Sequence, residues 1–111
     1  MKVVVSAKSN DIKSEVDPRF GRCRYFIIAH IENKVITSIE IIENTAKELE
    51  HGAGTKAAEI VAETGAKVLI TGRLGPNAIE ALSHFGIQAY SATCDINSAI
   101  KDFIDEKLKR I

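Results

Sequence analysis

Three arginines surround one of the two cysteines within ten residues, in the stretch DPRFGRCRYF that begins at Asp17. They are Arg19, Arg22 and Arg24, and the cysteine is Cys23. A guanidinium is always charged and donates several hydrogen bonds, whereas a thiolate is a nucleophile and a metal ligand. We therefore expect these arginines to bind a negatively charged group. Because neighbouring positive charges favour the thiolate, we expect Cys23 to bind metal.

Groups of the same two kinds occur elsewhere along the chain. Arg73 follows an apolar stretch, and Cys94 is the second thiol. His51 stands before Gly52 and Gly54 in HGAGTK, where a helical pattern begins, and the N-terminus of a helix attracts anions. The segment lacks the GxxxxGK[ST] spacing of a P-loop, so alone it is a weak phosphate signal. An arginine-rich loop can also be plain solvated surface, and a cysteine can be a small buried apolar residue.

The composition describes an ordinary globular chain, with 15 basic and 15 acidic residues, no net charge and 45% hydrophobic residues. Its 111 residues predict one domain, 1–111. Nucleic acid is disfavoured as a partner because binding phosphates takes an excess of Lys and Arg. No apolar run approaches the roughly 20 residues that span a bilayer, and the first residues are too short for a signal peptide. We therefore expect a cytoplasmic protein with no membrane partner.

The elements that must position the arginines and thiols follow from hydrophobic periodicity. Asn33 suits a hairpin turn, Gly65 and Gly86 suit helix ends, and Asp95 suits a helix start. The predicted order is β-β-β-α-β-α-β-α, with strands at 3–5, 25–31, 35–43, 67–72 and 88–92 and helices at 57–64, 76–85 and 96–108.

This order predicts an α/β fold with a five-stranded mixed sheet, in the strand order 3-2-1-4-5 with one antiparallel member. Open α/β sheets bind ligands outside the carboxyl ends of their strands. The loop 6–24 at that edge is polar and unusually long, and such loops are mostly functional or mobile. Topology brings to this edge Arg19, Arg22, Cys23, Arg24, His51, Gly52, Gly54, Arg73 and Cys94.

The segments DPRFGRCRYFIIA and HGAGTKAAEIVAETGAKVLITGRLGPNAIEALSHFGIQAYSA resemble the dinitrogenase iron-molybdenum cofactor biosynthesis family, the NifX/NifB-type small domains. The resemblance covers the chain from Met1 to about Phe103. It implies a ribonuclease H-like, three-layer α/β domain. The motif positions to which it points are Phe20-Gly21-Arg22, His51-Gly52, Gly54 and 72–76.

The resemblance also implies that the chain binds or carries an anionic iron-sulfur or iron-molybdenum cluster or its precursor, without catalysis. Cofactor-assembly proteins would then donate and accept the cluster. Thiolate and imidazole are the usual protein ligands of such clusters, so Cys23, His51 and Cys94 are the candidate metal ligands. Nothing in the family motifs requires a nitrogen-fixing host.

Two alternatives stay open, and one is disfavoured. The chain could bind a small anion or a nucleotide phosphate through the segment 52–54 and Arg73. It could also be a regulatory or scaffold domain that binds a protein partner through the same edge of the sheet or through an exposed edge strand at 35–43, which could also support a dimer. Metal-dependent nuclease chemistry is disfavoured because the first strand, MKVVVSAK, lacks the carboxylates that hold the metal ions.

Overall fold

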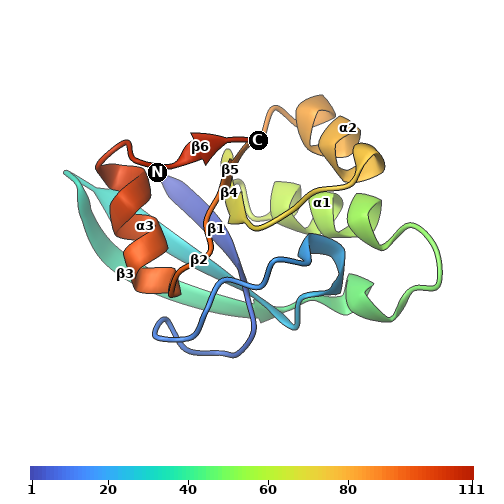
Figure 1. Cartoon of the computed structure of the whole chain (residues 1–111), viewed down its shortest axis with the longest axis horizontal. Coiled ribbons are helices and arrows are strands. Elements are labelled where there is room, and N and C mark those ends of the chain that lie inside the picture. The colour runs from blue at the N-terminus through green and yellow to red at the C-terminus, as the bar shows by residue number, and fades with distance from the viewer.

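The computed structural model describes residues 1–111, which fold into a mixed sheet with helices on both faces (Figure 1). Two short 3-10 helices, η1 (Phe20–Arg22) and η2 (Thr45–Glu48), lie in the connections. The strands are β1 (Lys2–Ala7), β2 (Tyr25–Glu32), β3 (Val35–Glu43), β4 (Val68–Thr71), β5 (Gln88–Ser91) and β6 (Lys109–Arg110). The α-helices are α1 (Ala53–Glu63), α2 (Pro76–His84) and α3 (Ile96–Ile104). None of these helices is long and apolar enough to cross a membrane.

The sheet has the order β3-β2-β1-β4-β5-β6, so the predicted order of the first five strands is confirmed. β1 pairs with β4 and β4 with β5 in parallel, while β2 runs antiparallel to both of its neighbours. The prediction of five strands is wrong, because β6 adds a sixth that runs antiparallel to β5. The carboxyl ends of β1, β3, β4 and β5 therefore open at one edge, as expected.

The sixth strand was missed because the third helix ends earlier than its apolar pattern does. Glu106 adopts a left-handed conformation, with φ of 58°, at the position where glycine usually ends a helix. The N–H of Lys107 donates to the carbonyl of Asp102, which closes the helix end. Leu108 still packs on the core under α3, so the apolar spacing continues where the helix does not.

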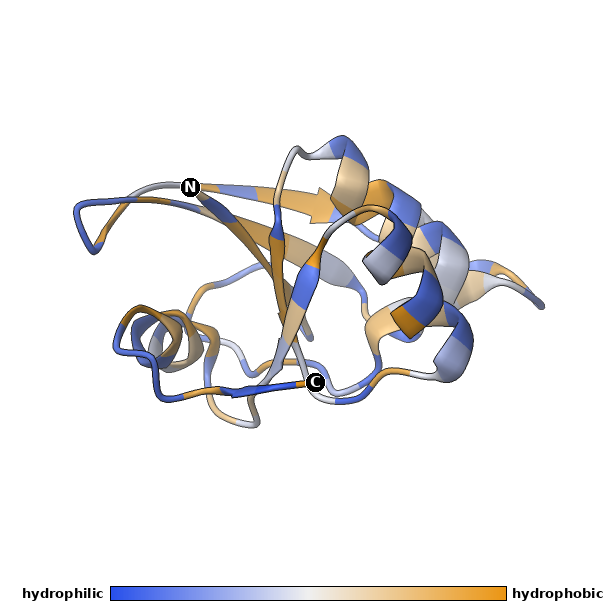
Figure 2. Cartoon of the chain, turned by 90° about the horizontal axis from the view of Figure 1, so that it is seen from above, coloured by the Kyte–Doolittle hydropathy of each residue, from blue (hydrophilic) through white to orange (hydrophobic).

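The core consists of two apolar clusters, one on each face of the sheet. α1 and α2 cover the face that carries Val4, Phe26 and Leu69. α3 covers the other face, which carries Val5 and Ile27. Figure 2 shows the apolar residues gathered in the strands between these two helical layers. The sheet thus separates the α1 and α2 side of the molecule from the α3 side.

The segment that joins β1 to η1 is tied to the sheet, although its sequence offers few apolar anchors. Val16 pairs with Ala7 in an isolated β-bridge, and its N–H donates to the carbonyl of Cys94. The Ser6 hydroxyl donates to the carbonyl of Asp17 at 2.7 Å, and the Thr71 hydroxyl is hydrogen-bonded to the same Ser6 oxygen at 2.7 Å. Hydrogen bonds to the carboxyl ends of β1 and β4 therefore hold this loop, together with the apolar side chains of Val16 and Ile12, which pack on the α3 side of the core.

Candidate functional site

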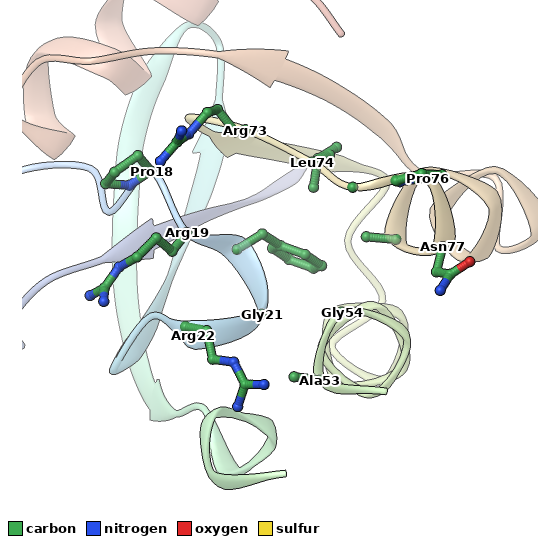
Figure 3. A pocket seen from close by; sticks show the side chains of 13 residues that line it. Pro18, Arg19, Gly21, Arg22, Ala53, Gly54, Arg73, Leu74, Pro76 and Asn77 are labelled. Atoms are coloured by element: carbon green, nitrogen blue, oxygen red, sulfur yellow. The ribbon is translucent and has the colours of Figure 1, made fainter. Parts of the chain in front are cut away.

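A cleft of about 510 Å³ opens at the carboxyl ends of the strands (Figure 3). Three segments that are distant in the sequence form it: the loop into η1, the first turn of α1, and the turn between β4 and α2. Its lining residues are 18–22, 53–54 and 73–78. The cleft therefore lies where the strand order predicts a ligand site.

Both helices that reach the cleft begin without a capping side chain. The N-cap residues are Gly52 for α1 and Gly75 for α2, and neither N-cap makes a side-chain hydrogen bond. Neither helix carries an acidic residue in its first turn. The first N–H groups of a helix have no partner within the helix, and they form the positive end of its dipole. Two helix N-termini suited to an anion thus converge on one cleft.

Small residues allow these backbones to approach one another closely. A Cβ atom placed on Gly21 would lie 2.9 Å from the backbone nitrogen of Gly54, and one placed on Gly54 would lie 3.2 Å from the Cβ of Ala78. A Cβ atom on Gly72 would lie 2.4 Å from the Cα of Pro18. Three of the glycines in the predicted motif positions, Gly21, Gly54 and Gly72, therefore serve close packing around the cleft.

Arg19 is held by an aspartate that the sequence analysis did not single out. Its guanidinium donates from Nε to Oδ1 and from Nη2 to Oδ2 of Asp17, both at 3.1 Å. The Asp17 side chain is 2% exposed, whereas that of Arg19 is 61% exposed. Hydrogen bonding and the negative charge of Asp17 raise the pKa of Arg19 above its ordinary value. The Arg19 head is turned away from the starts of α1 and α2 in Figure 3.

The other two arginines of the cleft come from η1 and from the turn after β4. Arg22 donates from Nη1 to the carbonyls of Lys47 and Leu49, at 2.7 and 2.6 Å, so η2 fixes its position. Arg73 is bound through its backbone N–H, which donates to the carbonyl of Pro18 at 2.9 Å. Three of the four arginines predicted at this edge, those at 19, 22 and 73, therefore line one cleft.

The predicted thiolate at Cys23 is wrong. Cys23 is fully buried in the core beneath α1, where its Sγ donates to the carbonyl of Phe20 at 3.3 Å. Burial away from water, and then the negative charge of Asp17, raise the pKa of Cys23 to about 12. The neighbouring guanidiniums do not reverse this, because Arg19 pairs with Asp17 and Arg22 binds carbonyls of η2 and of the residue that follows it.

Alkaline pH is therefore expected to destabilise the fold through Cys23. The thiol of the unfolded chain loses its proton near pH 9, whereas the folded thiol keeps it until about pH 12. The stability contribution of this thiol is complete below pH 9 and is lost progressively toward pH 12. Urea unfolding between pH 8 and 11 should show a steeper loss of stability for the wild type than for Cys23→Ala. Equal slopes would contradict the buried, protonated thiol.

The remaining predicted site residues lie outside the cleft. Cys94 packs against the cluster on the α3 face, so the sheet separates it from Cys23. His51 is exposed in the loop before α1. The Arg24 guanidinium lies over the ring of Tyr25, 5.3 Å from its centroid. No three His, Cys, Asp or Glu side chains stand so that they could hold a metal ion, and the structure does not bring Cys23, His51 and Cys94 together.

Two features of the cleft were not predicted from the sequence. One is the burial of Asp17 and its pairing with Arg19. The only sequence feature that could have predicted this pair is the presence of an acid two residues before an arginine. The other is the use of Asn77 and Ala78, in the first turn of α2, as cleft lining. The signal for the second was available, because a helix that opens on Gly75-Pro76 has no polar side chain at its N-cap.

The chain resembles several known proteins along its whole length. It is 39% identical to an uncharacterised protein of Methanocaldococcus jannaschii over 111 residues, which cover 99% of this chain and 91% of that protein. The apo form of the orange protein from Desulfovibrio gigas superposes with a TM-score of 0.90 at 33% identity, over 99% of this chain and 92% of that one.

A third relative comes from Thermotoga and is described as a candidate NifB protein. It superposes with a TM-score of 0.83 at 31% identity, over 98% of this chain and 91% of that one. The family model for the dinitrogenase iron-molybdenum cofactor matches residues 1–106. The chain therefore belongs to the dinitrogenase iron-molybdenum cofactor family.

Proposed function

We propose that this protein binds an anionic iron-sulfur or iron-molybdenum cluster, or a precursor of one, in the cleft and carries it during cofactor assembly. The observation that carries the proposal is the convergence of two uncapped helix N-termini with Arg19, Arg22 and Arg73. We propose binding and release alone, with no reaction catalysed by this domain.

The donor set of the cleft fits a charged cluster as cargo. Backbone N–H groups and guanidiniums donate hydrogen bonds, and hydrogen bonds to the sulfur atoms are among the interactions that proteins use to stabilise metal-sulfur clusters. The volume of about 510 Å³ far exceeds the roughly 30 Å³ that one water molecule occupies in the liquid, so a group of many atoms can enter. Charge and hydrogen bonds would hold the cargo reversibly, which suits a carrier.

A bond from the cargo to a protein side chain is a separate part of the proposal. Cys23 would have to leave the core before it could bind metal, because it is fully buried. His51 is exposed and immediately precedes Gly52, the N-cap of α1, so it is the candidate ligand that lies closest in the sequence to a helix start of the cleft. Cys94 lies on the α3 side, so it is the least suited of the three.

The names of two relatives support the proposal. The relative from Desulfovibrio gigas is called orange protein, and its solved structure is that of an apo form. The Thermotoga relative is described as a candidate NifB protein. We propose that this chain likewise binds a coloured group that can be removed. We propose that it does so during cofactor assembly in the cytoplasm, with donor and acceptor proteins as partners.

The unpaired edge of β3 is where a second copy could pair.

Anaerobic loading tests this proposal. The purified protein would be incubated with isolated iron-molybdenum cofactor or reconstituted with iron and sulfide, and then separated from unbound material by gel filtration. We expect a visible chromophore that elutes with the protein and metal that elutes in proportion. A protein that elutes colourless and free of metal would overturn the carrier function. A thermal shift with phosphorylated metabolites, in the absence of cluster uptake, would instead favour phosphate binding at the same helix N-termini.

A further inference from the structure

The carboxylate of Asp17 is buried beside a cleft that is otherwise suited to anions. Burying a charge is unfavourable unless a partner of opposite charge compensates for it. The partner is Arg19, whose side chain reaches into solvent while that of Asp17 does not. The pair is therefore built with the acid inside the protein and the guanidinium at the surface of the cleft.

Three hydrogen bonds fix Arg19 on this carboxylate. The backbone N–H of Arg19 donates to Oδ1 of Asp17 at 2.9 Å, in addition to the two guanidinium bonds. A guanidinium carries five N–H donors, and the pairing with Asp17 uses two of them. The other three donors make no hydrogen bond within the protein, and the carboxylate sets their position.

Asp17 is itself mounted on the rigid part of the fold. Its N–H donates to the carbonyl of Ser6 at 2.8 Å, and its carbonyl accepts from the Ser6 hydroxyl at 2.7 Å. Thr71 holds the same hydroxyl from the end of β4, and all three residues are buried. Hydrogen bonds to the carboxyl ends of β1 and β4 thus fix Asp17, and through it Arg19.

The same segment places Arg19 next to a second arginine. Arg19 and Arg73 form a parallel β-bridge, and both line the cleft. Like charges on neighbouring strands repel, and Asp17 pairs with Arg19, whereas Arg73 has no acidic partner. In Figure 3 both side chains lie on the Pro18 side of the cleft, opposite the starts of α1 and α2.

We propose that Asp17 is a positioning residue for anion binding, which holds Arg19 beside Arg73 as a fixed clamp for the outer end of the ligand. The proposal rests on the proposed function, since it concerns how the same cleft grips its cargo. The alternative role for Asp17 is to withhold Arg19 or to neutralise it. The two roles predict opposite effects when the charge of Asp17 is removed.

The test compares Asp17→Asn and Arg19→Lys with the wild type, with isolated iron-molybdenum cofactor and inorganic pyrophosphate as probes. Asp17→Asn makes the cleft more positive by one charge, yet a positioning role predicts binding that is about tenfold weaker. Arg19→Lys keeps the charge but cannot make the two-point pair, so it should lose affinity to a similar extent. Because Arg19 is exposed, this second variant should fold even if the first does not.

Two further readouts separate positioning from a general structural effect. In the double variant, Asp17→Asn should add nothing to the loss caused by Arg19→Ala, because Asp17 acts through Arg19. By nitrogen-15 NMR of the free protein, the Arg19 Nε–H should exchange slowly with water in the wild type and rapidly in Asp17→Asn.

The outcomes are distinguishable from those of the carrier proposal. A wild type that binds pyrophosphate but no cluster would end the carrier function and leave the role of Asp17 to be decided with pyrophosphate. Binding by Asp17→Asn that equals or exceeds that of the wild type would overturn the positioning role. Equal exchange of the Arg19 Nε–H in both proteins would overturn it as well, as would a wild type that binds neither probe.

Discussion

The double variant Arg22→Ala, Arg73→Ala is expected to bind iron-molybdenum cofactor at least about 100-fold more weakly than the wild type. Each arginine supplies a charged donor, and a hydrogen bond to a charged group contributes about 1.5–3 kcal/mol. Neither side chain pairs with an acid, and the two hydrogen bonds that Arg22 donates to the carbonyls of Lys47 and Leu49 are exposed to water, so the fold should keep its melting temperature within a few degrees. Equilibrium titration followed by visible absorbance would measure the affinity.

The matched control is Arg24→Ala, Arg110→Ala. This control also removes two positive charges, but from residues outside the cleft. Arg24 lies over Tyr25, and Arg110 belongs to β6. We expect this control to bind nearly as tightly as the wild type at 0.15 M salt, because neither residue lines the cleft and salt screens exposed charges that do not contact the ligand. If the control lost as much affinity as the cleft variant, binding would depend on net charge and not on this cleft.

Replacing Gly72 by alanine is expected to destabilise the protein by about 3 kcal/mol and to lower its melting temperature by about 13 °C. The new Cβ would lie 2.4 Å from the Cα and 2.6 Å from the Cβ of Pro18, and neither atom belongs to a flexible side chain. The turn after β4 and the loop into η1 would have to separate. Thermal unfolding followed by circular dichroism would measure the change.

Gly75→Ala is the control for this substitution, three residues along the same turn. A Cβ on Gly75 meets nothing within 4 Å, and its φ of −80° is open to any residue. Gly75 is the N-cap of α2, where alanine is less favourable than glycine, so we expect a loss of no more than about 1 kcal/mol. A Gly72→Ala protein as stable as Gly75→Ala would contradict the close contact between Gly72 and Pro18.

The order of the elements and the edge that carries the cleft could be predicted from the sequence. Gly65 and Gly86 have positive φ at the ends of α1 and α2, and the Asp95 side chain accepts from the N–H of Ser98 at the start of α3. Each of these positions carries the residue type that its local conformation favours. Glu106 does not, and there the prediction continued the last helix beyond its end and missed β6.

The chemistry of the candidate site was harder to predict because it depends on which way each side chain points. Cys23 and Arg24 are adjacent in the sequence, yet the Cys23 side chain is buried in the core and the Arg24 guanidinium lies over the ring of Tyr25. Adjacent residues in extended backbone face opposite ways, so a dense cluster in sequence becomes dispersed in space. The burial of Asp17 depends on Ser6 and Thr71, which no local pattern connects to it.

The glycine N-caps of α1 and α2 link cargo to folding. A bound anion would accept hydrogen bonds at the places where a serine or aspartate side chain normally does, so the cargo would act as the missing cap of two helices at once. A helix cap contributes about 1 kcal/mol, and a ligand that binds only the folded state stabilises it. Each release of cargo would therefore leave behind a less stable protein, and the melting temperature would report how much of a sample is loaded.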